Sequence, residues 1–309
     1  MLEYIVRRLL SSLLILFLVS IIVFLFLHMI PGDPARMVAG PEASLQDVLA
    51  VRRQLGLDHP LYLQFWLFLT HALQGNFGTS FRTGATVSSE IAQHIVPTLE
   101  LTLCSLAWAV LLGTVIGVVA AVYHSRWPDQ LSMSGAVLGI SAPEMWIGLM
   151  AIAVFSVRLG WFPVGGTVGL QGIILPSFTL GLGVCAITAR FTRTSLVDVL
   201  NEDFIRTAYA KGLGTGRVVM RHGLRNALLP VITMTGLQLG FLLGGSVIVE
   251  TVFSWPGIGQ LLVASVGIRD YPVIQALMLV FSLEFLVINL VVDVLYAIVD
   301  PRIHLQSKD

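Results

Sequence analysis

The sequence predicts an all-α polytopic membrane protein with six transmembrane helices and with both termini in the cytoplasm. Of its 309 residues, 56% are hydrophobic and only 12% are charged, and the mean hydropathy is +0.86. A soluble domain carries about 25% charged residues, so this composition indicates a chain that lies largely in lipid. Basic and acidic residues balance at 18 each, and this balance gives no reason to expect a nucleic-acid partner.

Six apolar runs are long enough to cross a bilayer, whose hydrocarbon core of about 30 Å needs roughly 20 residues of helix. They cover residues 9–30, 99–123, 131–157, 170–189, 227–249 and 274–299. The first run is longer than the apolar core of a signal peptide, and no small-residue cleavage pattern follows it. We therefore expect it to be retained as the first transmembrane helix.

Prolines and a short apolar segment modify this pattern. Pro143, beside Glu144, lies in the third run and Pro176 in the fourth, so both helices are expected to kink. Residues 61–73, LYLQFWLFLTHAL, are too few to span, and they predict an amphipathic helix at the membrane interface. Cys104 and Cys185 lie in apolar runs without the spacing of a disulfide or a metal site, so no metal is expected.

The distribution of Lys and Arg predicts the orientation. With the N-terminus inside, 12 of the 18 basic residues fall on the cytoplasmic side, and seven of these lie in one loop between the fourth and fifth runs. Residues 31–98 then form an outer segment whose aromatic residues and turn signals predict folded short helices. We expect a division into residues 1–98, the first helix with this segment, and 99–309, a five-helix core with a cytoplasmic loop at 190–226.

The cytoplasmic loop contains the most basic stretch of the chain, RTAYAKGLGTGRVVMRHGLRNALLP from Arg206 to Pro230. Phe204, Ala208 and Gly212 recur at i+4 steps and predict one stripe of a short helix, which the following glycines interrupt. Charge alone is explained by a loop that only sets topology. Small residues on one helical face favour instead a helix that docks closely into a groove of another protein.

These residues resemble the cytoplasmic EAA loop of ABC import permeases. Arg206, Thr207 and Ala208 occupy the place of the acidic-Ala-Ala triplet, Gly212 that of its glycine, and Leu229-Pro230 that of the final LP. The arginine in the acidic place and the late LP are similar to the peptide and nickel branch of that family. The resemblance extends to YIVRRLLSSLLILFLVSIIVFLFLHMIPGDPAR, QLGLDHPLYLQFW, QGNFGTSF, ETVFSWPGIGQLL, RDYPVIQA and LVVDVLYAIVDPRI, and within the branch it is greatest to permeases of glutathione import.

The resemblance implies a type I importer permease fold in a bacterial inner membrane. It implies a second permease subunit, two ABC ATPase subunits or domains, and a periplasmic solute-binding protein, with glutathione, a short peptide or a nickel complex as cargo. The expected coupling residues are Phe204, Arg206, Thr207, Ala208, Lys211, Gly212 and Leu213. The sequence contains no GxxxxGK[ST], so we expect a non-catalytic subunit that binds no cofactor itself, with ATP and Mg in the ATPase partners.

Ionisable residues within spans are costly and usually line a cavity. Glu144 is predicted either to line the transport pathway or to form a structural hydrogen bond, and Glu284 is the second pathway candidate. Glu100 lies close enough to the interface to be solvated, and Asn289 with Asp293 predicts a packing pair. A self-contained ion-coupled secondary transporter, using Glu144 and Glu284, remains the main alternative class.

The outer loop ETVFSWPGIGQLL has two interpretations. It is a re-entrant turn anchored by an interfacial tryptophan, or, by the family resemblance, a segment that reaches toward the solute-binding protein. The residues concerned are Glu250, Phe253, Trp255, Pro256 and Gly257. The tail DPRIHL is expected to end the last helix and to lie near an ATPase.

Overall fold

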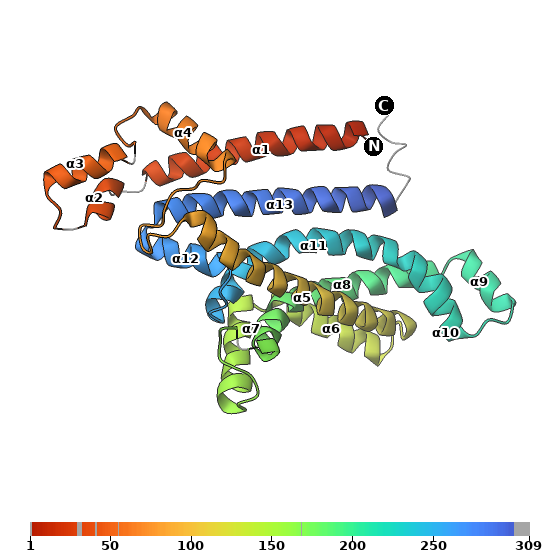
Figure 1. The fold of residues 1–309 in the computed structure, drawn as a ribbon. Coiled ribbons are helices and arrows are strands. Elements are labelled where there is room, and N and C mark those ends of the chain that lie inside the picture. Colours follow the sequence, from red (N-terminus) through yellow and green to blue (C-terminus); the bar gives the residue numbers. More distant parts are fainter. Residues whose placement is uncertain (1, 30–32, 41, 55, 168, 300–309) are drawn as a thin grey trace. The chain divides into compact units, whose positions relative to one another are not determined.

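The computed structural model describes residues 2–29, 33–40, 42–54, 56–167 and 169–299, and it is helical almost throughout (Figure 1). The elements are α1 Leu2–Met29, α2 Pro34–Ala39, α3 Leu45–Gln54, α4 Leu61–Leu73, α5 Val87–Val122, α6 Trp127–Ser141, α7 Glu144–Ala151, the π-helical η1 Ile152–Arg158, α8 Gly169–Leu200, α9 Asp203–Ala210, α10 Thr215–Arg217, the π-helical η2 Val218–Gly223, α11 Leu224–Val252, α12 Ile258–Ile268 and α13 Tyr271–Val299. Within these ranges the β-pairing consists of one isolated bridge between Thr79 and Thr86.

The predicted spans are present as helices. Five helical stretches are long and apolar enough to cross a membrane, at Arg8–Leu25, Val87–Val122, Gly169–Leu200, Pro230–Val252 and Tyr271–Val292. The sixth is the pair Trp127–Ser141 and Glu144–Arg158, which is bent by 101°. The outer segment forms α2, α3 and α4, as the prediction of short helices required.

The third predicted span is therefore a broken helix instead of a kinked one. Ala142 leaves the helical region at ψ 128°, as expected for a residue before proline, and Pro143 at the start of α7 has no N–H for the α6 ladder. Pro176 lies inside α8, which continues through it from Gly169 to Leu200. Pro230 likewise lies inside α11, within the fifth predicted span.

The chain packs as two compact units. Unit 1 contains Pro97–Gln260 with the described part of Ile288–Asp309, and unit 2 contains Leu2–Val96 with Leu261–Val287. Both units are therefore defined by packing and are discontinuous in sequence. The division at residue 98 remains a prediction about the organisation of the chain.

Close helix packing in unit 1 depends on small residues. A Cβ added at Gly113 would lie 2.6 Å from the Cys185 carbonyl oxygen, and one at Gly117 would lie 2.6 Å from that of Ala189. The backbones of α5 and α8 are therefore in close contact at these glycines, as small residues allow in membrane helices. The buried Cys185 belongs to the core of this unit. α8 also packs against α6, α7 and α11.

Candidate functional site

The cytoplasmic loop forms a helical hairpin between α8 and α11. α8 ends at Leu200, α9 runs from Asp203 to Ala210, and α10 with η2 leads back into α11. Figure 1 shows α9 and α10 at one end of the α8 and α11 pair. The left-handed backbone of Gly212, with φ 79°, follows the end of α9, a conformation that glycine adopts without cost.

α9 has one face against its own chain and one face exposed. Ile205 and Ala208 are buried with Val218, and Leu200 and Leu213 pack against this cluster. Phe204 and Tyr209, which flank the buried pair on either side of the helix, are each 43% exposed. The same surface includes the exposed residues Arg206, Thr207, Lys211 and Gly212.

The expected stripe of Phe204, Ala208 and Gly212 is therefore wrong. Ala208 points into the chain, Phe204 is exposed, and Gly212 lies beyond the end of the helix. The larger apolar residue Ile205 is the buried anchor, and Ala208 follows it at i+3. Tyr209 was not among the residues predicted for this surface. An aromatic side chain in a polar loop was the one feature of the sequence that could have indicated it.

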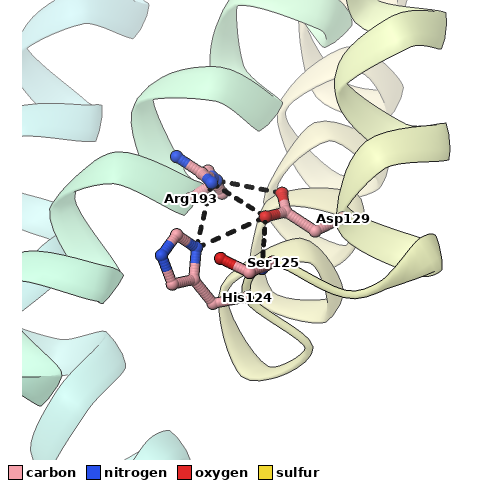
Figure 2. Close-up of polar contacts among 4 residues, drawn as sticks. All are labelled: His124, Ser125, Asp129 and Arg193. Carbon is pink, nitrogen blue, oxygen red and sulfur yellow. Dashed lines mark hydrogen bonds and ion pairs between the residues drawn. The ribbon is translucent and has the colours of Figure 1, made fainter.

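A buried ion pair connects the α5–α6 turn to the cytoplasmic end of α8 (Figure 2). The Asp129 carboxylate, in the first turn of α6, accepts from Arg193 Nε at 3.0 Å and from Arg193 NH2 at 2.8 Å. It also accepts from the backbone N–H of Ser125 at 2.9 Å, and His124 Nδ1 lies 3.3 Å from its Oδ2. Asp129 is only 4% exposed.

The bidentate geometry makes this pair strong and directional. It fixes α8 seven residues before its end at Leu200, where the chain turns toward α9. Sequence reasoning counted Arg193 only as a topology signal and did not consider Asp129, since 64 residues separate them. An aspartate at the start of an apolar run was the one available signal.

Glu144 lies at the first position of α7, directly after Pro143, and is half-buried. A Cβ added at Gly245 of α11 would lie 3.1 Å and 3.3 Å from the two Glu144 carboxylate oxygens. The glycine thus leaves room for the carboxylate between α7 and α11, and Leu180 lies against the same spot. Within the described parts of the chain, no hydrogen bond or ion pair of the Glu144 side chain is found.

The outer loop is a buried structural connection. Glu250 is 0% exposed, and its carboxylate accepts from Thr98 Oγ1 at 2.7 Å and from the N–H groups of Gly259 at 2.7 Å and Gln260 at 3.0 Å. The carboxylate thus caps the first turn of α12, whose N–H groups have no helical partner. A Cβ at Gly257 would collide with this carboxylate.

Trp255 is not an interfacial anchor, so that prediction is wrong. It is 3% exposed, and its Nε1 donates to the Pro97 carbonyl oxygen at 2.9 Å. Phe253 is equally buried in the core of unit 1, while Pro256 is half-buried. Four of the five predicted outer-loop residues, all but Pro256, are therefore packed or bonded within the connection between α11 and α12, and contact with a binding protein stays a prediction.

The remaining acidic residues lie on other elements. Glu284 is half-buried in α13 within unit 2, whereas Glu144 belongs to unit 1. Glu100 is exposed on α5, as expected for a solvated residue. The Asp293 side chain and the tail DPRIHL lie outside what the structure describes, so the predicted pair with Asn289 stays a prediction.

Comparisons with known proteins agree with this architecture. Residues 113–305 match the family described as "Binding-protein-dependent transport system inner membrane component", and residues 1–102 match its N-terminal region. The chain is 59% identical over 303 residues to the glutathione transport system permease protein GsiC of Escherichia coli K12, covering 98% of this chain and 99% of that protein. The same permease of Salmonella typhimurium is 58% identical over equal coverage.

Solved structures share the fold. The methionine ABC transporter MetNI, in an inward-facing conformation, superimposes with a TM-score of 0.57 at 19% identity, over 68% of this chain and 96% of that one. An amino acid ABC transporter crystallised with histidines gives 0.55 at 14% identity, over 68% and 94%. The chain belongs to the family of inner membrane components of binding-protein-dependent transport systems.

Proposed function

We propose that this chain is one of two permease subunits of an ATP-driven importer that moves glutathione from the periplasm to the cytoplasm. The observation that supports the cargo is 59% identity, over nearly the full length of both chains, to a permease named for glutathione transport. Dipeptides, oligopeptides and nickel complexes are the alternative cargoes of the same branch. A solute-binding protein delivers the cargo at the outer face.

The exposed face of α9 is the surface through which ATPase subunits act on the permease. Phe204, Arg206, Tyr209 and Lys211 remain exposed, although Ile205 and Ala208 of the same segment are packed into the chain. A helix fixed on one side, with aromatic and basic residues on the other, fits a groove of a partner protein. ATP and Mg bind to that partner, whose binding and hydrolysis of ATP shift the permease between outward-facing and inward-facing arrangements.

Glu144 lines the pathway through unit 1. Its half-buried carboxylate has no partner in the described chain, and it lies beside Gly245 at the start of the second part of a broken helix. Broken helices and unpaired acids are typical of solute pathways in transporters. A structural hydrogen bond, the other interpretation of Glu144, has less support from this geometry.

The test is reconstitution of the complex purified from its own membranes. Mass spectrometry identifies the accompanying chains. Proteoliposomes are then assayed for uptake of labelled glutathione, with the binding protein outside and ATP enclosed inside. Uptake that requires the binding protein and ATP is expected. Uptake by this chain alone along an ion gradient contradicts the proposal and supports a secondary transporter.

The coupling surface needs a variant that leaves the fold intact. Gly212 is unsuitable, because its φ of 79° would strain any larger residue regardless of docking. Phe204→Ser changes an exposed side chain, and Tyr62→Ser changes another exposed aromatic, on α4 in the outer segment. We expect Phe204→Ser to reduce uptake at least about tenfold with normal insertion, and Tyr62→Ser to leave uptake unchanged. Equal uptake by both variants contradicts the role of α9.

A further inference from the structure

The stretch from the end of α10 to the start of α11 carries three exposed arginines that none of the functions above uses. They are Arg217, which ends α10, Arg221 in η2 and Arg225 in α11. Among the residues that the structure describes, none of the three side chains forms an ion pair or a hydrogen bond, although Asp198 and Glu202 belong to the same loop. Their charges therefore remain available to a partner outside the chain.

The three arginines lie on one face of this helical stretch. They recur at every fourth position, and residues four apart are neighbours on successive turns of a helix. A second series with the same spacing, Val219, Gly223 and Ala227, is buried. Val219 and Ala227 pack in one cluster with Leu196 of α8, and a Cβ added at Gly223 would lie 3.0 Å from the Leu196 side chain. Because the two series are offset by about half a turn, the arginines lie opposite the face that packs on α8.

This arginine face lies at the predicted cytoplasmic boundary of the fifth span. The span begins at Pro230, so Arg225 precedes it by about 8 Å of helix at 1.5 Å per residue. Lipid head groups occupy roughly 5–8 Å on each side of the hydrocarbon core, which places Arg225 at their depth. Arg221 follows one turn farther out, where an anionic membrane surface still attracts it, because the surface potential extends about 8–10 Å. Met220, 59% exposed, adds an apolar side chain to the same stretch.

The composition and the depth of the arginine face fit an anionic phospholipid. Guanidinium groups pair with two oxygens of a phosphate in a fixed geometry. Basic clusters directly beside a transmembrane helix attract anionic lipid, and each residue close to the surface strengthens binding about fivefold. The proposed coupling surface differs, because it combines its charges with the aromatic residues Phe204 and Tyr209 and belongs to α9 instead of the entry to a span.

We propose that Arg217, Arg221 and Arg225 bind the phosphate groups of anionic phospholipids in the cytoplasmic leaflet. This inference requires neither a cargo nor an ATPase, so it stands independently of the proposed function. The bound lipid lies on one side of η2 and the start of α11, and the packing on Leu196 lies on the other. Because a ligand that binds only the folded chain stabilises it, anionic lipid should raise the unfolding temperature of the protein.

The test uses the protein purified with its accompanying chains in a nonionic detergent. Unfolding of this chain is followed through a fluorescent tag while phosphatidylglycerol or phosphatidylcholine is titrated into the micelles. We expect phosphatidylglycerol to raise the midpoint of the wild type at a concentration at least about tenfold lower than phosphatidylcholine, and 0.5 M salt to reduce this preference. The triple variant Arg217→Gln/Arg221→Gln/Arg225→Gln should lose most of the preference, and Arg225→Gln alone should lower it about fivefold. Lysine at all three positions keeps the charges and should retain the preference within about threefold.

The matched control is Arg36→Gln/Arg53→Gln/Arg82→Gln, which removes the same charge from three exposed arginines spread over the outer segment and should keep the wild-type preference. A wild-type preference in the triple variant of the arginine face, or no preference in the wild type, overturns the lipid site. Loss of the accompanying ATPase chains from that triple variant, at an unchanged lipid preference, overturns it as well and assigns the face to a protein partner. An equal rise of the wild-type midpoint with inorganic phosphate alone overturns the lipid as the source of the phosphate.

Discussion

Replacing Glu250 by alanine should destabilise the fold at the α11–α12 connection. The carboxylate is fully buried and accepts from the Thr98 hydroxyl and from the N–H groups of Gly259 and Gln260. Alanine leaves the two N–H groups buried at a helix start without an acceptor. Glutamine keeps one oxygen for them and differs only where its amide meets Thr98.

The magnitudes follow from these contacts. An unsatisfied buried donor costs about 1–3 kcal/mol, so two of them with the lost packing cost about 4 kcal/mol in the Glu250→Ala variant. In Glu250→Gln, Thr98 Oγ1 must accept from the new amide while it already accepts from Ile258 N at 2.9 Å. A hydroxyl oxygen has two lone pairs, so this arrangement is feasible and should cost about 1 kcal/mol.

Thermal unfolding of the purified protein in detergent, followed by size-exclusion chromatography, measures the difference. Since 1 kcal/mol corresponds to about 2–4 °C for chains of this order of size, we expect Glu250→Ala to lower the midpoint by about 10 °C and Glu250→Gln by a few degrees. Glu100→Ala, at an exposed acid on α5, is the control. A midpoint of Glu250→Ala equal to that of the control would refute a capping role for the carboxylate.

Three other changes test the remaining contacts. Arg193→Met leaves Asp129 buried without its cation and should lower the free energy of unfolding by about 3 kcal/mol. Adding Asp129→Asn should recover most of this loss, and a double variant whose thermal midpoint stays as low as that of Arg193→Met would contradict the role of the pair. Gly117→Val places a Cβ within 2.6 Å of α8 and should sharply lower the yield of folded protein, measured by fluorescence-detected chromatography. Gly135→Ala is the control, because a Cβ at that position has no neighbouring atom within 4 Å, and it should leave the yield unchanged. Glu144→Gln should reduce labelled-glutathione uptake about tenfold at an unchanged unfolding midpoint, and normal uptake would return Glu144 to a structural role.

Local properties made the spans and the position of the distortion at Pro143 predictable. Apolar length identifies a transmembrane helix, and the proline at position 143 predicted a kink. The structure shows a full break with a bend of 101°, because the proline also moves Ala142 out of the helical region. The short helix of the cytoplasmic loop was also predictable. Which face it buries was not, because that depends on Val218 and Leu200, which contact Ile205 only in the fold.

The sequence pattern could not predict interactions between residues that are far apart in the chain. Asp129 and Arg193 are each ordinary charges near a membrane boundary, and only the packing of α6 on α8 makes them a buried pair. Trp255 suggested an interfacial anchor because tryptophan is common there. In the fold the Glu250 carboxylate caps α12, and Trp255 in the same loop is buried against α5, where its Nε1 donates to the Pro97 carbonyl oxygen.

α8 provides the mechanical connection between the proposed coupling surface and Glu144. Leu200 at its end packs both with Ile205 of α9 and with the cluster around Leu196, so a displacement of α9 acts directly on α8. The Asp129–Arg193 pair would carry that displacement to α6, and α8 also packs against α7, which begins with Glu144. Close-packed interiors transmit strain instead of absorbing it. A movement of α9 imposed by an ATPase would therefore reach the broken helix through contacts within unit 1, and loosening the Asp129–Arg193 pair should lower the solute moved per ATP hydrolysed more than it lowers hydrolysis itself.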